Sequence, residues 1–321
     1  MRQNLRQSEC RDGSVSDSVQ GNWVDARAPG WTRPYLRLSR ADRPVGTWLL
    51  LIPCWWGLAL AILADPAGAN GFDAWIAIGC AAGAFLMRGA GCTWNDYTDR
   101  HFDAAVARTR SRPLPSGQIT PKAALVWMCL QAILAFGILL TFPLSAILFG
   151  LGSLAVVCLY PFAKRFTWWP QVFLGLAFNW GIPLAWLAHG NGLGMSVLLA
   201  YVAGVSWTLF YDTMYAHQDK TDDALIGVKS TARLFGKTTK SWLILFVVTT
   251  ISGMTGAVVL TRADAFPMTI SLFGVACFGM HLCWQLRVLD IDAPDVCLSL
   301  FRTNREAGLL LTSFVLIASL L

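Results

Sequence analysis

Charged residues are scarce in this sequence, and their scarcity excludes most soluble classes of protein. Only 14% of the 321 residues are charged, whereas 55% are hydrophobic, and the mean hydropathy is +0.51. A soluble domain of this length carries a larger charged share. The apolar residues gather into stretches of about 18 to 22 residues, the length that a helix needs to cross a bilayer. The sequence therefore predicts an all-α integral membrane protein.

Patterns for disulfides, zinc, export and nucleic acid are also missing. The nine cysteines include no C-x-x-C pair, and the four histidines show no ligand spacing, which is typical of scattered packing residues. The first forty or so residues lack the apolar run of a cleavable signal peptide. No basic run with interleaved aromatics stands apart from the apolar stretches, so nucleic acid is not an expected partner.

Nine membrane spans are predicted, separated by polar loops or by connections rich in Pro, Gly, Asp and Asn. The expected spans are residues 45–64, 72–92, 123–142, 143–162, 171–189, 193–211, 242–260, 266–284 and 307–321. Residues 1–36 are expected to form a mobile cytoplasmic tail that ends in a short interfacial helix. Residues 37–321 are expected to form one polytopic membrane domain.

The basic residues alternate between the two sides of the predicted spans. Eight precede the first span, and five, two, five and three lie in every second connection after it. The other connections hold only Arg262, and Arg88 is the one basic residue inside a span. The positive-inside rule then places the amino terminus and the long polar loops in the cytoplasm, or in the matrix of a mitochondrion. The formal charge of +6 is thus a topology signal.

Two acidic segments follow membrane spans directly. The first acidic motif is residues 95–103, after the second span, and the second acidic motif is residues 212–223, after the sixth. Helical spacing of i, i+4 and i+8 places several of their oxygen ligands on one face of each helix. These residues are Asn95, Asp99 and Asp103 in the first motif, and Asp219 and Asp223 in the second, with Asp212 expected on the same face seven residues before Asp219.

Carboxylates gathered this closely repel one another unless a cation neutralises them. Oxygen ligands without His or Cys in register favour Mg²⁺, which also takes water and substrate phosphates as ligands. The alternative is that these acids are solvated loops that flank membrane helices. Two such motifs four spans apart favour an internal four-helix repeat, whose halves face each other across one central cavity.

Basic residues accompany both motifs. Arg108, Arg110 and Arg112 follow the first, and Lys229, Arg233 and Lys237 follow the second. Such cations suit a diphosphate bridged by Mg²⁺, although they could equally be charges that set the topology.

Two further arginines lie at or within membrane spans. Arg88 lies within the second span, on the same helix face as Asn95, and a cation at that depth is functional unless it snorkels to the interface. Arg43, just before the first span, is either an anchor or a clamp for a carboxylate.

The amino-acid sequence of both motifs resembles that of the UbiA family of membrane prenyltransferases. The family pattern N-D-x-x-D-x-x-x-D is met by Asn95, Asp96, Asp99 and Asp103, and its D-x-x-x-D pattern by Asp219 and Asp223. The pattern R-T-x-x-R-P-L-x-S-G is satisfied from Arg108 to Gly117. Residues 211–216 and 227–232 look like the branch that acts on 4-hydroxybenzoate. The resemblance runs from about Arg37 to the carboxyl terminus.

This resemblance implies a site and a reaction. Asn95, Asp99 and Asp103 would hold one Mg²⁺, and Asp219 and Asp223 a second, with both ions on a polyprenyl diphosphate. The implied diphosphate-binding residues are Arg88, Arg108, Arg112, Tyr160, Lys164 and Lys229. The polyprenyl group would pass to the ring of 4-hydroxybenzoate, ortho to the hydroxyl, as in ubiquinone biosynthesis. Asp96 would orient or deprotonate that hydroxyl, and Arg43 would bind the carboxylate.

Two rival interpretations stay open. The first is a member of the same family with another aromatic or haem acceptor. The second is an ion transporter, which predicts acids in the middle of spans, whereas these acids lie at the ends of spans. The expected location is a bacterial or mitochondrial inner membrane, with the lipid bilayer itself as a partner of the apolar substrate.

Overall fold

The computed structural model describes residues 21–105, 109–225 and 227–321, and every regular element among them is a helix. Eight helical segments are long and apolar enough to cross a membrane, which confirms the first eight predicted spans. They comprise α4 (Val45–Ala64), α5 (Asp73–Ala105), α6 (Pro121–Leu139), α7 (Leu144–Phe166), α8 with α9 (Pro170–Asn179, Gly181–His189), α10 (Met195–Ala216), α13 (Thr239–Val259) and α14 (Ala265–Val288).

The ninth predicted span lies in a helix that begins earlier than expected. Helix α15 extends over Pro294–Ser319. Its first turns carry charged residues, so a prediction from apolar runs places its start too late. This helix is not among the eight segments that meet the hydropathy criterion.

The predicted span at residues 171–189 is divided into α8 and α9 at Trp180. Pro183 lies in the first turn of α9. A proline has no N–H for the carbonyl four residues earlier, here that of Asn179, and its ring crowds that carbonyl. The interruption thus follows from a single residue.

The chain divides into two compact units. The first unit, as far as it is described, consists of residues 21–47, 83–105 and 109–137, and the second of residues 48–82, 138–225 and 227–321. Helices α4 and α5 contribute to both units.

In the second unit, helices from distant parts of the sequence meet around buried aromatic rings. The ring centroids of Trp56 and Trp207 lie 4.8 Å apart, and that of Phe278 lies 5.6 Å from Trp56. The indole of Trp207 donates to Asn304 at 2.9 Å, and Asn304 donates to Gln285 at 3.1 Å. These polar contacts inside the bundle join α10, α14 and α15 where a membrane offers no water as a partner.

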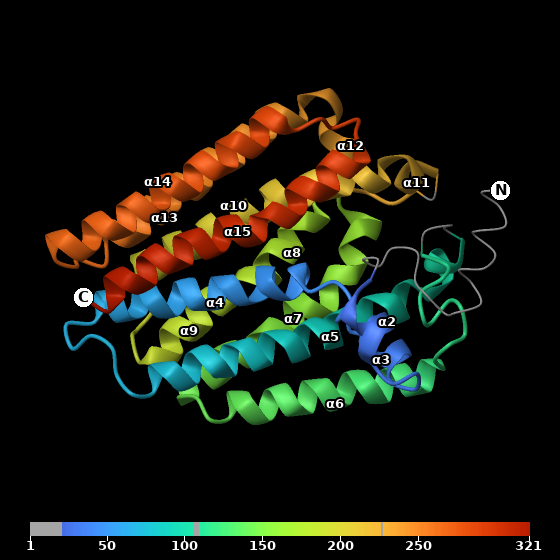
Figure 1. Cartoon of the computed structure of the whole chain (residues 1–321), viewed down its shortest axis with the longest axis horizontal. Coiled ribbons are helices and arrows are strands. Elements are labelled where there is room, and N and C mark those ends of the chain that lie inside the picture. Colours follow the sequence, from blue (N-terminus) through green and yellow to red (C-terminus); the bar gives the residue numbers. More distant parts are fainter. Residues whose placement is uncertain (1–20, 106–108, 226) are drawn as a thin grey trace. The chain divides into compact units, whose positions relative to one another are not determined.

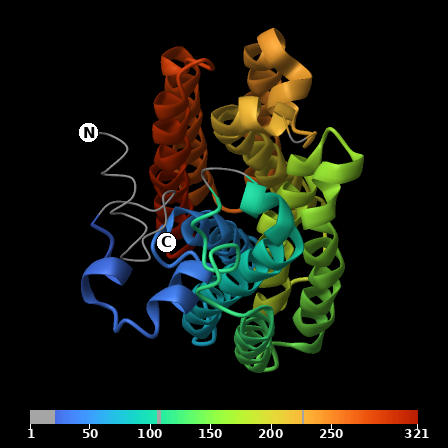
Figure 2. The ribbon, with the colours of Figure 1, turned by 90° about the vertical axis from the view of Figure 1, so that its right-hand side faces the viewer.

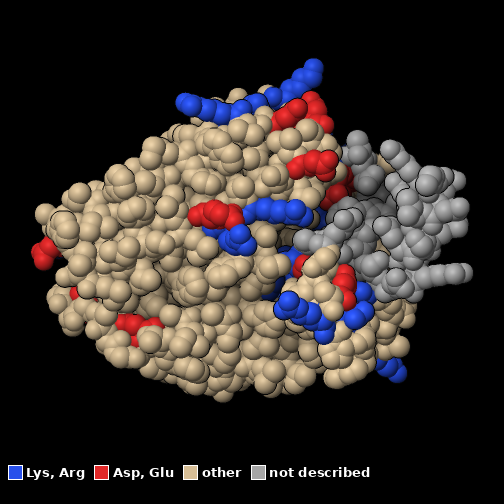
Figure 3. Space-filling model, in the orientation of Figure 1, with Lys and Arg blue, Asp and Glu red and all other residues tan. Residues whose placement is uncertain are grey.

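Figures 1 and 2 show α14 and α15 lying side by side in this unit. On the face drawn in Figure 3, the left half of the surface is mostly uncharged, and most of the charged side chains lie in the right half, on the side of the connection between these two helices. An uncharged belt with charges at one end is typical of helices that face lipid.

A cluster of polar residues ties together two connections at the other end of this bundle. The ring of His189 contacts Asp73 at 2.6 Å through Nδ1 and Asp65 at 3.2 Å through Nε2. The backbone N–H of Asn70 donates to Asp73 at 2.7 Å. Asp65 begins the α4–α5 connection and Asp73 is the first residue of α5, whereas His189 ends α9.

In the first unit, two short helices, α2 (Trp23–Arg27) and α3 (Arg33–Leu38), precede the first span. The predicted tail thus ends in two helices, and α3 extends past residue 36, where the tail was expected to end. Leu38 packs with Leu114, Ile119 and Ala124 of the loop and helix that follow α5. This core fixes the segment before α4 against the segment after the first acidic motif.

Candidate active site

The first acidic motif continues a membrane helix, as its spacing predicts. Helix α5 extends without interruption to Ala105, so Asn95, Asp99 and Asp103 share one of its faces. Asp99 is 1% exposed and Asp103 9% exposed. Carboxylates so shielded require cationic partners.

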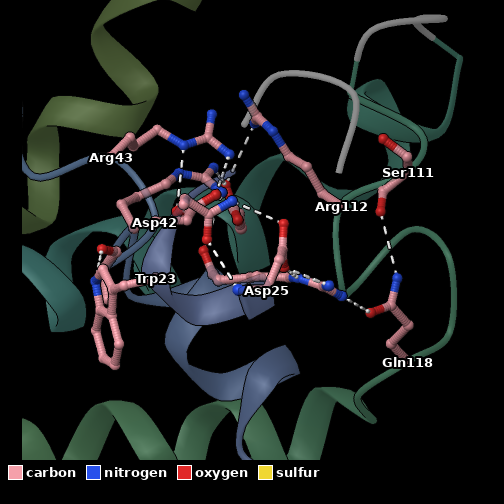
Figure 4. A network of polar contacts seen from close by, with 12 residues as sticks. Trp23, Asp25, Asp42, Arg43, Ser111, Arg112 and Gln118 are labelled. Carbon is pink, nitrogen blue, oxygen red and sulfur yellow. Dashed lines mark hydrogen bonds and ion pairs between the residues drawn. The ribbon is translucent and has the colours of Figure 1, made fainter. Parts of the chain in front are cut away.

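Asp96 is fully buried between two arginines of the first unit. Its Oδ1 accepts from Arg40 at 2.6 Å and from Arg112 at 3.3 Å. The same nitrogen of Arg112 lies 2.9 Å from Oδ2 of Asp103. In Figure 4, Arg112 extends from the loop after α5 toward Arg43 and Asp42. Arg112 therefore joins two acids of the motif, as a cation next to a metal and diphosphate site would.

Arg40 is a residue that the sequence reasoning missed. It lies between α3 and α4, is 7% exposed, and has a backbone φ of 58°. A non-glycine residue in this left-handed region costs about 1–2 kcal/mol, and such strain concentrates at functional sites. The only sign of it in the sequence is that an arginine stands three residues before Arg43.

Arg43 and Arg88 both lie near the start of α4. Arg43 contacts Asp42 at 3.0 Å, and Asp42 is 1% exposed. A Cβ at Gly46 would come within 2.7 Å of Nε of Arg88, so the missing side chain makes room for this guanidinium. The two predicted substrate-binding arginines thus flank the same turn of the chain, and their roles toward substrate stay predictions.

The segment before Arg40 is itself anchored by an ion pair. Arg37, 3% exposed, contacts Asp25 at 2.6 Å, and Asn22 also donates to Asp25 at 2.7 Å. Burial raises the pKa of the Asp25 carboxyl, but the hydrogen bonds from Arg37 and Asn22 and the charges of Arg37 and Arg33 outweigh it and leave that pKa below its ordinary value.

A lowered pKa predicts a loss of stability in acid. The contribution of Asp25 is complete above the ordinary carboxyl pKa of about 3.9 and is lost as the pH falls through the lower folded value. Because Asp25 is partly exposed, we expect a contribution of about 1 kcal/mol or less. Thermal unfolding in detergent should show that Asp25→Asn loses stability relative to the wild type above this range and that the difference narrows below it. A difference that does not depend on pH would contradict this assignment.

The second acidic motif, in the second unit, is less regular than predicted. Helix α10 ends at Ala216, a 3-10 turn covers His217–Asp219, and α11 (Lys220–Leu225) follows. Because a 3-10 turn advances by three residues per turn, Asp212 does not keep the helical register with Asp219 that a continuous helix would give. Asp219 and Asp223 lie on either side of the start of α11.

Two basic segments of the second unit meet beside this motif. The backbone N–H of Lys229 donates to the carbonyl of Lys164 at 3.1 Å, and Nζ of Lys229 donates to the carbonyl of Phe166 at 3.3 Å. Arg233 donates to the carbonyl of Asp223 at 3.2 Å. The structure therefore brings two predicted diphosphate ligands, Lys164 and Lys229, together at the carboxyl end of α7, one turn beyond Tyr160.

The predicted site residues fall into two groups. The first unit holds Arg43, Arg88, Asn95, Asp96, Asp99, Asp103 and Arg112, and the second holds Tyr160, Lys164, Asp219, Asp223 and Lys229. Arg108 lies outside the described residues. Among the described residues, no three His, Cys, Asp or Glu side chains are grouped closely enough to hold a metal by themselves. The predicted roles of these residues stay predictions.

Comparison with known proteins decides the family. The model of the UbiA prenyltransferase family matches residues 50–312. The chain belongs to this family. It is 46% identical over 295 residues to the mitochondrial 4-hydroxybenzoate polyprenyltransferase of Rattus norvegicus, covering 91% of this chain and 76% of the relative. It is 42% identical over 310 residues to the enzyme of that name from Arabidopsis thaliana, covering 95% of this chain and 74% of the relative.

Solved structures support the same fold. A UbiA homologue from Aeropyrum pernix K1 superposes with a TM-score of 0.70 at 21% identity, over 84% of this chain and 97% of its own. A UbiA homologue from Archaeoglobus fulgidus, bound to GPP and Mg²⁺, gives a TM-score of 0.69 at 17% identity, over 90% of this chain and all of its own. The helical membrane fold predicted from the sequence is therefore confirmed.

Proposed function

We propose that this protein is an integral membrane enzyme that transfers a polyprenyl group from polyprenyl diphosphate to 4-hydroxybenzoate, as ubiquinone biosynthesis requires. The observation that carries the proposal is the 46% identity, over 91% of the chain, to a relative named for this activity. Both acidic motifs of the family pattern are present, and buried cations accompany the first of them.

The donor chemistry fits a divalent metal, for which Mg²⁺ is the natural choice. The acids on α5 supply only oxygen ligands, and Asp99 is almost fully buried on the face that it shares with Asn95. Asn95, Asp99 and Asp103 would hold one ion and Asp219 with Asp223 another, where each ion would neutralise diphosphate oxygens. A UbiA homologue of this fold has been solved with GPP and Mg²⁺.

The residues of the chain then have separable tasks. Arg88, Arg108, Arg112, Lys164 and Lys229 would bind the diphosphate and stabilise its charge as the allylic carbon–oxygen bond breaks. The ring carbon ortho to the hydroxyl would form the new bond to the allylic carbon, and the proton that this ring carbon carried would pass to the released diphosphate. Arg43 would hold the carboxylate of the acceptor, and Tyr160 would contact the diphosphate beside Lys164.

The orientation in the membrane follows from the distribution of basic residues. The proposal places both acidic motifs and the amino terminus on the cytoplasmic or matrix side. The proposal places the enzyme in a bacterial or mitochondrial inner membrane, and the mitochondrial names of the relatives support the mitochondrial choice. A polyprenyl chain would enter the site from the bilayer, because it is too apolar to cross water.

Membranes carrying the protein test the proposal. With 4-hydroxybenzoate, Mg²⁺ and polyprenyl diphosphates of several lengths, we expect a ring-prenylated acid that mass spectrometry identifies. Chelation with EDTA should remove more than about 99% of the rate, as expected for the loss of a charge-stabilising ion, and added Mg²⁺ should restore it. Product from another aromatic acceptor but none from 4-hydroxybenzoate would overturn the choice of acceptor, and unchanged turnover in EDTA would overturn the metal.

A further inference from the structure

Arg40 contacts the first acidic motif, although neither the family patterns nor the membrane topology calls for an arginine there. It comes from the segment before the first span, yet its guanidinium lies 2.6 Å from Oδ1 of Asp96 in α5. Arg112 contacts the same oxygen at the longer distance of 3.3 Å. Two buried arginines therefore share one carboxylate oxygen, and Arg40 is the closer of the two.

The position of Arg112 depends on how strongly Asp96 attracts it. Arg112 lies between two carboxylates of α5, at 2.9 Å from Asp103 and at 3.3 Å from Asp96. Asp96 is 0% exposed, so water does not screen its charge. While Arg40 neutralises Asp96, the stronger pull on Arg112 comes from Asp103. Without Arg40, the buried charge of Asp96 would draw Arg112 inward.

The backbone around Arg40 holds its side chain in place. Its φ of 58° turns the chain sharply between α3 and α4. Its N–H donates to the carbonyl of Arg37 at 3.0 Å, and Nη1 reaches the same carbonyl at 3.5 Å. Because Nη1 contacts the carbonyl of Arg37 and Nη2 contacts Asp96, the guanidinium of Arg40 is held in one place. Arg40 is therefore suited to hold a neighbouring side chain in position.

We infer that Arg40 is a positioning residue for the donor substrate: it occupies the carboxylate of Asp96 and thereby leaves Arg112 beside Asp103, available to the diphosphate. The inference rests on the proposed function for the identity of the donor. Beside its predicted role toward the acceptor hydroxyl, the buried Asp96 thus also balances the charge of Arg40. The segment before the first span thus takes part in substrate binding.

Arg40→Asn tests this inference, because asparagine tolerates a left-handed backbone and removes only the cation. We expect the KM for polyprenyl diphosphate to rise about tenfold, as for the loss of one charge-assisted contact, while the KM for 4-hydroxybenzoate stays unchanged. Arg40→Lys should give an intermediate KM. The double variant Arg40→Asn with Asp96→Asn should recover most of the loss, because nothing then draws Arg112 inward.

Arg37→Met is the matched control. Arg37 is also buried and also pairs with an aspartate, but its partner Asp25 lies outside the acidic motif. Arg37→Met should lower the melting temperature without raising the KM for polyprenyl diphosphate. An equal rise in both variants, or no rise in Arg40→Asn and Arg40→Lys, would overturn the inference.

A binding measurement separates this inference from the proposed function. Calorimetry of the purified protein with a non-reactive prenyl thiolodiphosphate and Mg²⁺ requires no acceptor. Weaker binding by Arg40→Asn, about tenfold in Kd, with binding restored in the double variant, would support the positioning role even if 4-hydroxybenzoate proved to be the wrong acceptor. Unchanged binding by Arg40→Asn would count against it whatever the acceptor.

Discussion

Asp219→Asn and Asp223→Asn are each expected to reduce prenyl transfer by at least about a hundredfold, because each removes an anionic ligand from the proposed second metal. Asparagine has almost the same shape as aspartate, so the fold around α11 and the contacts of Arg233 with the backbone carbonyl of Asp223 should persist. The rate of product formation at saturating Mg²⁺ measures the effect. Raising the concentration of Mg²⁺ should recover part of it.

A matched control comes from the same unit of the protein. Asp264 is exposed, lies in the connection between α13 and α14, and belongs to neither acidic motif. Asp264→Asn should retain wild-type activity and the wild-type melting temperature. If Asp219→Asn kept more than half of the activity of this control, the second motif would not be a metal site.

Gly57→Ala is expected to cause the largest loss of stability among substitutions of alanine for a described glycine. A Cβ at Gly57, in α4, would lie 2.7 Å from the backbone Cα of Ile182 and closer still to its carbonyl oxygen. Backbone atoms of α9 cannot move aside as a flexible side chain would, so α4 and α9 would have to separate. We expect a cost above about 3 kcal/mol, at the upper end of overpacking, with a lower melting temperature in detergent.

Gly83→Ala provides the comparison, since Gly83 also lies inside a membrane helix, α5, but has nothing within 4 Å of the position of a Cβ. Here alanine should leave the melting temperature unchanged or raise it, because glycine inside a helix costs about 0.5–1 kcal/mol relative to alanine. Equal destabilisation by the two substitutions would show that the close approach of α4 and α9 contributes little.

The sequence predicted the membrane helices well because hydropathy and helix length follow directly from the thickness of the bilayer. Residues 45–64 form α4 within the expected limits, and α5 carries the first motif on one continuous helix, as spacing required. Local chemistry that depends on one residue was less visible. The division at Trp180 follows from Pro183, and the 3-10 turn at residues 217–219 shifts the register of the second motif.

The candidate site was predictable as far as motifs describe it. Family patterns identify Asp99 and Asp219, but Arg40 contributes through a contact with a residue 56 positions away in the sequence. No periodicity reports such a pair, and the left-handed backbone that presents Arg40 has no signature in an arginine. Side chains that act through other side chains therefore emerge only from the folded chain.

The ring of His189 has a mechanical consequence for the far end of the second unit. Because it contacts both Asp65 and Asp73, it fastens the start and the end of one hairpin bend to the last turn of α9. Strain in that bend would therefore be transmitted to α9 through His189, so that residues 65–73 and the last turn of α9 would move together. Among the described residues, no hydrogen bond or ion pair joins the bend at residues 261–264 to His189, Asp65 or Asp73, so this bend is the natural place to attach a probe without loosening the bundle.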